Sequence, residues 1–285
     1  MSPTPIVAPY VPSYAATEPY ITAAEFKAGA TGVNVSALVP NGDAAAQLNA
    51  LQQKIAGASG AADSYCNQPL ACTRVVQYGR YFARNGRVLV PTEQMPVIAV
   101  ESASLGVVGA MQPLSSFDAV TFPSQNVVEL PFALGRELDS TGRAAVQLTY
   151  LAGFANALLT ADAVQGATVL TLGDTLGMYP GMILQIMDPG KDERVTVTAV
   201  TDTMLTLSAG TSFAHAAGAR VTAMPPAITQ AVILLTAVLI KTRASESVVL
   251  SSMNGGQMSK QVMDPSAATQ LAQAVDLLSG FRRVA

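Results

Sequence analysis

The sequence is short of the residues from which most active sites are built. It has one histidine, His215, two cysteines and no tryptophan among 285 residues. Only 12% of the residues are charged, and the net charge is −3. The sixteen Lys and Arg residues form no cluster, so the chain lacks the cations that displace counterions from DNA phosphates. We therefore expect no avid binding of nucleic acid, whereas transient contact with a passing nucleic acid is compatible with this composition.

Motifs of nucleotide-binding and nucleophilic sites are also missing. The chain contains no G-x-S-x-G, no G-x-x-x-x-G-K-[ST] and no G-x-G-x-x-G. The run GGQMSK (255–260) resembles a phosphate loop only in composition, since it lacks the spacing and a preceding strand, and we interpret it as a mobile loop. We predict that the chain is not an enzyme and has no catalytic, cofactor-binding or metal-binding residue.

His215 is the one side chain that bears directly on this prediction. A catalytic imidazole needs a second polar group aimed at it, and the surrounding FAHAA supplies none. We expect the histidine to hold a turn through hydrogen bonds to the backbone; a partner from elsewhere in the chain is the alternative. The run DPGKDE (188–193) carries three carboxylates, for which we favour a solvated hairpin tip over a weak calcium site.

The two cysteines, Cys66 and Cys72, lie close together in YCNQPLACT. No further thiol or imidazole is nearby, so a closed zinc site cannot be assembled locally. We favour two buried free thiols, and a local disulfide is the alternative.

Long hydrophobic runs are scarce as well. The most apolar one, AITQAVILLTAVLI (227–240), is shorter than the roughly 18–20 residues that cross a bilayer and contains Thr and Gln, so it predicts a buried helix. Residues 1–20 contain five prolines without hydrophobic periodicity or a basic start, which indicates no secretory signal. We expect residues 1–40 to form an extended amino-terminal arm and the protein to be made in the cytosol.

The rest of the chain shows mixed helical and strand patterns, which predict an α+β fold. From Asn41, or Asp43 as an alternative cap, a helical stripe runs to Tyr65, with Gly57 and Gly60 as possible break points. Two β-rich runs flank Asn85-Gly86, the signature of a tight hairpin. Further strands are predicted in PVIAVES, NVVEL and AAVQLTY, which completes a core of one helix and a β region over 41–156.

Residues 157–224 form a distinct unit. Five short strands separated by turn signals predict a small all-β domain, either a barrel or a sandwich, inserted into the surrounding pattern. Residues 225–285 return to helix and are expected to complete the core and to provide a partner-binding tail.

Three stretches resemble the head–tail connector (adaptor, or head-completion) proteins of long-tailed bacteriophages. AGASGAADSYCNQPL resembles the end of that family's first helix, VQLTYLAGF resembles the strand that closes its β region, and MPPAITQAVILLTAVLIKTRASE resembles the helix that follows. Their order along the chain carries the resemblance, which covers most of 40–282. In simpler relatives this strand and helix are nearly consecutive, whereas here the β unit stands between them.

The resemblance implies a structural protein of the virion neck, assembled in the host cytoplasm. Its copies would form a closed ring, commonly twelve-fold, between the portal protein and a downstream neck or tail protein. DNA would pass through the ring without specific binding, and no membrane or cofactor would be involved. The resemblance also places the carboxyl-terminal segment against the portal, with Leu278, Phe281, Arg282 and Arg283 as interface residues; a frayed basic terminus is the alternative for this segment.

Two other functions share parts of this pattern. A tail-terminator or capsid-decoration protein would have the same composition and β insert but would bind tail tube or shell. A hydrolase with a β accessory domain would require His215 or the 188–193 cluster to face a pocket. We expect a structural protein of the first kind.

Overall fold

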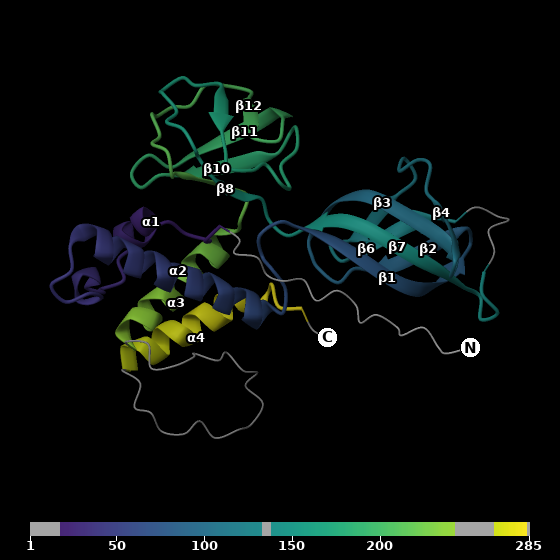
Figure 1. The fold of residues 1–285 in the computed structure, drawn as a ribbon, viewed down its shortest axis with the longest axis horizontal. Helices are drawn as coiled ribbons and strands as arrows, with labels where there is room; N and C mark the ends of the chain where they lie inside the picture. The colour runs from purple at the N-terminus through teal and green to yellow at the C-terminus, as the bar shows by residue number, and fades with distance from the viewer. Residues whose placement is uncertain (1–17, 133–137, 243–264, 284–285) are drawn as a thin grey trace.

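The computed structural model describes residues 18–132, 138–242 and 265–283, and these form three lobes of mixed α and β structure with two antiparallel sheets (Figure 1). The helices belong to one lobe, and each sheet forms a lobe of its own. The helical segments are α1 Ala23–Ala28, a 3₁₀ turn at Val35–Ala37, α2 Ala44–Cys66, α3 Pro226–Lys241 and α4 Pro265–Ser279. The run 255–260, predicted to be a loop, lies outside the described residues.

Helix α2 confirms the stripe that was read from the sequence from Leu51 onward, whereas Leu48, which the same spacing includes, is exposed. Its buried residues include Leu51, Ile55, Ala58 and Ala62, which recur every three or four positions. Asp43 caps the start, where its carboxylate accepts a hydrogen bond from the backbone nitrogen of Ala46 at 2.7 Å. The helix continues through both glycines without a break, since its buried face packs against α3 and α4.

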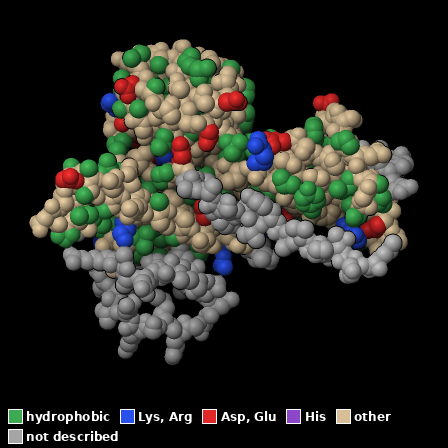
Figure 2. Space-filling view, viewed as in Figure 1, with side chains coloured by type: hydrophobic (Ala, Val, Ile, Leu, Met, Phe, Trp, Pro, Cys, Tyr) green, Lys and Arg blue, Asp and Glu red, His purple; other side chains and the backbone are tan. Residues whose placement is uncertain are grey.

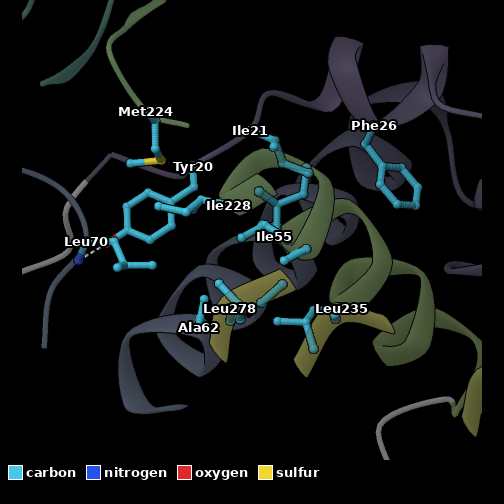
Figure 3. Packing of buried hydrophobic residues seen from close by; sticks show 14 of the residues in the cluster. Tyr20, Ile21, Phe26, Ile55, Ala62, Leu70, Met224, Ile228, Leu235 and Leu278 are labelled. Carbon is cyan, nitrogen blue, oxygen red and sulfur yellow. Dashed lines mark hydrogen bonds between the residues drawn. The ribbon is translucent and has the colours of Figure 1, made fainter. Parts of the chain in front are cut away.

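The expected extended arm over 1–40 is wrong for its described part. Residues 18–40 include α1 and the 3₁₀ turn, and Tyr20 and Ile21 are fully buried in the helical core (Figure 3). The Tyr20 hydroxyl donates to Asp63 Oδ1 at 2.6 Å and accepts from the backbone nitrogens of Leu70 and Ala71 at 3.2 and 3.1 Å. This tyrosine satisfies backbone N–H groups of the segment that connects α2 to β1.

The first sheet has seven strands in the order β4-β3-β7-β1-β2-β6-β5. Its strands are β1 Thr73–Arg84, β2 Arg87–Pro91, β3 Val97–Val107, β4 Ala110–Pro113, β5 Thr121–Ser124, β6 Val127–Pro131 and β7 Arg143–Ala152. Asn85 and Gly86 make the predicted hairpin, with φ values of 52° and 73°. The sheet curls around one apolar core. Its two edges approach each other, since the backbone nitrogen of Val97 in β3 donates to the carbonyl of Gln125, between β5 and β6, at 2.9 Å.

The second sheet closes into a barrel, one of the two forms expected for the inserted unit. Its strands, in the order β8-β13-β10-β11-β12-β9, are β8 Asn156–Leu158, β9 Val169–Thr171, β10 Ile183–Met187, β11 Glu193–Val200, β12 Met204–Leu207 and β13 Arg220–Thr222. Leu159 and Leu172 bridge the two edge strands, and Thr160 N donates to Thr171 O at 3.0 Å. Closure leaves this sheet without an open edge.

A buried ion pair joins the barrel to the helical lobe. Arg220 of β13 has no exposed surface, and its guanidinium donates to both carboxylate oxygens of Glu25 in α1. It also donates to Asn156 Oδ1 at 3.2 Å and to Thr229 Oγ1 of α3 at 3.3 Å. A buried charge is tolerated where a carboxylate and further acceptors surround it, so this pair fixes how the two lobes meet.

Both cysteines are buried and free, which confirms the favoured prediction. Burial raises the pKa of each thiol to about 12, so both are protonated at neutral pH. Within the described ranges, no helix combines the length and apolar character needed to span a membrane.

Asp63 makes the stability of the helical lobe depend on pH. Burial raises the pKa of Asp63 to about 6, against the opposing hydrogen bonds from Tyr20 and the backbone of Leu70. Because this value exceeds the ordinary 3.8, the folded state binds the proton more tightly than the unfolded state. The contribution is complete below pH 3.8 and is lost as the pH rises through about 6.

We predict that Asp63→Asn removes this dependence, because the amide oxygen still accepts both hydrogen bonds but does not ionise. The free energy of unfolding of the wild type should fall between pH 4 and pH 7 by about 1–3 kcal/mol relative to the variant. Urea titrations at several pH values measure this, with the exposed Asp202→Asn as control. Parallel pH profiles for the wild type and Asp63→Asn would contradict the assignment.

Candidate functional site

His215 has partners that the local sequence did not indicate. Its Nδ1 lies 3.1 Å from Asp188 Oδ2 and its Nε2 lies 2.7 Å from Glu193 Oε1. The expectation that its ring bonds to the backbone is therefore wrong: the ring is held by two carboxylates from the 188–193 hairpin. The backbone of His215 does bridge to Ala163, so the residue also holds the chain in place.

His215, Asp188 and Glu193 form a cluster, called here the histidine cluster, in which both nitrogens of the imidazole have a carboxylate partner. The imidazole side chain is completely buried, and that of Glu193 is only 9% exposed. Burial of Glu193 opposes ionisation, but hydrogen bonds from His215 and from the backbone of Ser212 outweigh it and lower the pKa of the carboxyl. A ring with a carboxylate on each nitrogen has no free nitrogen for a substrate.

The same hairpin does not gather its carboxylates around a cation. Asp188 and Glu193 lie on opposite nitrogens of the imidazole, and Asp192 accepts a hydrogen bond from the backbone of Asp188 at 2.8 Å. No group of three His, Cys, Asp or Glu among the described residues is placed to hold a metal ion. The solvated hairpin tip anticipated here is thus tied down by the histidine.

A hollow near the surface lies elsewhere, on the helical lobe. It is lined by α1 and the segment that follows, from Phe26 to Val35. Lys27 is its one titratable lining residue. A single lysine beside backbone and apolar groups does not make an acid–base or nucleophilic pair.

The residues expected at the partner interface lie where α2, β1 and the chain's carboxyl-terminal segment meet. Leu278 is fully buried in the helical core, so its side chain is not available to a partner. Phe281 is half-buried and packs edge-on against Phe154, with ring centroids 6.0 Å apart. Arg282 is exposed, and its guanidinium lies 5.5 Å from the ring centroid of Tyr65.

Arg283 and Gln68 fasten this segment to the two lobes that flank it. The backbone nitrogen of Arg283 donates to the carbonyl of Cys66 at 2.9 Å, and its side chain donates to the carbonyl of Glu93. The buried Gln68 donates to the carbonyl of Phe281 at 3.0 Å and accepts from the backbone of Met95 at 2.9 Å. The tail is therefore an ordered strap up to Arg283, and Arg282 is its most accessible charged group.

Two of the stretches that carried the resemblance meet at this junction. The strand β7 ends at Ala152 and is followed by Gly153 and Phe154, and Gly153 has φ +107°. A Cβ there would lie 2.5 Å from the carbonyl oxygen of Ala71, so only glycine fits. Phe154 N donates to the carbonyl of Leu70 at 2.8 Å, which joins the strand end to the exit of α2.

The surfaces carry few charges and several exposed apolar side chains. Figure 2 shows few charged side chains on the visible face, some of them in small groups of opposite sign. Exposed large apolar residues occur on both β lobes, and they include Val76, Tyr78, Phe82 and Leu89 on the seven-stranded sheet and Val164, Ile183 and Met204 on the barrel. These faces, rather than a cleft, are the candidate functional surfaces.

Sequence reasoning missed the buried pair Glu25–Arg220 and the Tyr20–Asp63 contact. The sequence does indicate the first of these. Arg220 is the one charged residue in the run GARVTAM, which is predicted to be a buried strand, so its side chain needs a partner inside the fold. Tyr20 gives no such signal, because it follows a proline in a segment without periodicity.

We predict that His215→Ala destabilises the barrel, since it removes the ring that both Asp188 and Glu193 contact and leaves two neighbouring carboxylates without that partner. The free energy of unfolding should fall by about 2–3 kcal/mol, a larger effect than a turn histidine would give. Denaturant titration measures it, with the exposed neighbour Phe213→Ala as control. Equal stability of the two variants would contradict the role assigned to the cluster.

Comparisons with known proteins give few matches. No family model and no curated protein matches this chain. Among solved structures, a chain described as "Neck of empty GTA particle computed with C6 symmetry" is similar, with a TM-score of 0.38 and 16% sequence identity. The similarity covers 93% of this chain and 94% of that chain. A TM-score this low does not establish a common fold, so the proposals below rest on the residues of this chain.

Proposed function

We propose that this protein is a structural subunit of a virion neck, whose copies form a ring between a portal and a tail. The observation that carries the proposal is the outward face of α2. Its exposed residues are all uncharged: Ala44, Ala45, Leu48, Asn49, Gln52, Gln53, Ala56, Gly57, Gly60 and Ser64. A helix face that stays in water is normally rich in charged residues, so this face fits contact with another protein.

The nature of the face favours a neighbouring copy. Small side chains such as Ala56, Gly57 and Gly60 let another backbone or sheet approach closely, and no ion pair has to be desolvated. If this face meets a different surface of the next copy, the contact is heterologous, and repeating it by rotation closes a ring. The resemblance to head–tail connectors supports this arrangement, and it adds the portal and a tail-side protein as partners.

The charge of the protein suits a channel through which DNA slides. With sixteen cationic residues against nineteen anionic ones, a ring would not bind phosphates tightly enough to hold DNA in place. Arg220 is sequestered with Glu25, and Arg74 is paired with Glu101, so neither cation is free to bind a phosphate. We infer passage of DNA rather than its capture.

The portal contact is proposed at the strap that ends at Arg283. Of the four residues expected there, Arg282 is exposed and able to reach a partner, while Phe281 and Arg283 hold the strap on the subunit. Deleting residues 270–285 is not a clean test, because Ala274 and Leu278 belong to the helical core. A single charge reversal at Arg282 leaves that core intact.

We predict that Gly60→Arg prevents ring assembly without unfolding the subunit. A Cβ at Gly60 meets no atom within 4 Å, and arginine is a better helix former than glycine. Mass photometry and negative-stain microscopy should show rings for the wild type and single subunits for the variant, with unchanged circular dichroism.

The control at the same position is Gly60→Ala, which adds little bulk. It should keep the ring and raise subunit stability by about 1 kcal/mol. Rings formed equally well by Gly60→Arg would show that the outward face of α2 is not the contact. A wild type that stays a single subunit at high concentration, with or without portal, would overturn the ring proposal.

We predict that Arg282→Glu weakens binding to portal rings by about tenfold, since a charge at an interface rim is reversed. Arg194→Glu, an equal charge change on an exposed barrel strand, is the control and should bind portal like the wild type. Pull-down with portal and, separately, with tail tube measures both. Binding to tail tube alone would favour a tail-terminator role and contradict the portal contact.

A further inference from the structure

The outer face of β1 exposes apolar side chains that the fold itself does not require, among the exposed arginines Arg74, Arg80 and Arg84. Alternate residues of this strand point to opposite sides of the sheet: Val75 and Gln77 are buried, whereas Val76, Tyr78 and Phe82 face outward. Tyr78 and Phe82 are 63% and 62% exposed. Two aromatic rings this exposed, four residues apart on one strand, form a ridge that water covers poorly.

Leu89 of β2 extends the ridge. The register pairs Ala83 with Val88 and Arg84 with Arg87, so the next outward position after Arg87, Leu89, lies beside Phe82. Leu89 is 54% exposed. We call Val76, Tyr78, Phe82 and Leu89 the aromatic ridge.

Neighbouring strands do not cover the ridge. In β7, the residues opposite Val76 and Tyr78 are Thr149 and Gln147, which are short or polar. The guanidinium of Arg143 lies 4.4 Å from the centre of the Phe82 ring, which engages the ring but leaves it exposed. The ridge therefore lacks an apolar cover in the described part of the chain.

Residues 1–17 have the composition that fits such a surface. MSPTPIVAPYVPSYAAT contains four prolines and five large apolar or aromatic residues after the initial methionine, and its first charged neighbour is Glu18. Proline-rich segments bind aromatic surfaces in the extended polyproline form, because their backbone is already restricted and loses little entropy. Residues 1–17 carry no charged side chain, so docking buries no ion of the segment, and the exposed Arg80 beside the ridge can keep its guanidinium in water.

The point where this segment enters the fold lies at the base of β1. Tyr20 bonds to the backbone nitrogens of Leu70 and Ala71, and β1 begins at Thr73. From Thr73 to Phe82 the strand advances about 30 Å, at about 3.4 Å per residue. Seventeen residues in the polyproline form reach about 53 Å, so the segment is long enough to follow the whole ridge.

We propose that residues 1–17 dock along the aromatic ridge of their own chain. Prolines and tyrosines of the segment pack on Tyr78 and Phe82, and Val76 and Leu89 flank them. This contact goes beyond the proposed function, since it belongs to the single subunit and does not depend on a ring. It also assigns the ridge to the subunit's own segment and leaves the outward face of α2 for other copies.

The absence of tryptophan from the sequence makes a clean test possible. In the variant Tyr78→Trp, the single indole reports whether the ridge is covered. The variant is compared in the full chain and after removal of residues 2–17, which leaves Tyr20 in place. Because docking removes most of the exposed ring surface, we expect acrylamide quenching to be about threefold weaker, with emission at shorter wavelength, in the full chain.

The control is Phe213→Trp on the barrel, 43% exposed in the wild type, whose quenching should not change on truncation. Measurements are made at dilutions where mass photometry shows single subunits, so the outcome does not depend on ring assembly. Equal quenching of Tyr78→Trp in the full and truncated chains would overturn the proposal. Protection that appears only as concentration rises would overturn it too, in favour of a second copy on the ridge.

Discussion

The hydroxyl of Tyr20 is hydrogen-bonded to the segment that connects α2 to β1, and the arrangement of the lobes depends on that contact. It accepts from Leu70 and Ala71 and donates to the buried Asp63. The same few residues of chain receive the end of β7 through Phe154 and the carboxyl-terminal strap through Gln68. Segments far apart in sequence thus share one set of hydrogen bonds. Because buried polar groups without partners cost more than a made bond gains, displacing any one of these segments exposes the others.

Buried polar and charged groups connect distant elements of this protein. Arg220 joins the barrel to α1 and α3, and His215 closes a hairpin within the barrel. The exposed residues of α2 are uncharged, and the outer face of β1 exposes the aromatic ridge among its arginines. Such surfaces suit contact between protein subunits.

Elements with a strong local pattern could be predicted from the sequence. The stripe of α2, the Asn85-Gly86 hairpin and the alternating strand β7 all depend on residues within a few positions of each other. Features that depend on distant partners could not. The ring of His215 contacts carboxylates that lie 22 and 27 residues away in sequence. Tyr20 follows a proline-rich segment, yet its hydroxyl bonds to residues 43 to 51 positions later. The sequence did not decide between a barrel and a sandwich for the second sheet. The strand β8 is only three residues long, and the bridge that closes the sheet joins residues that are not neighbours in sequence.

The central claim is that identical subunits join through the outward face of α2 into a ring that continues a DNA channel. A cryo-electron microscopy reconstruction of the purified protein mixed with portal rings tests it most directly. The account predicts a closed ring stacked on the portal, with α2 of each subunit covered by the next and the strap at Arg282 facing the portal. Subunits that bind singly, or a ring in which α2 faces solvent, would contradict it.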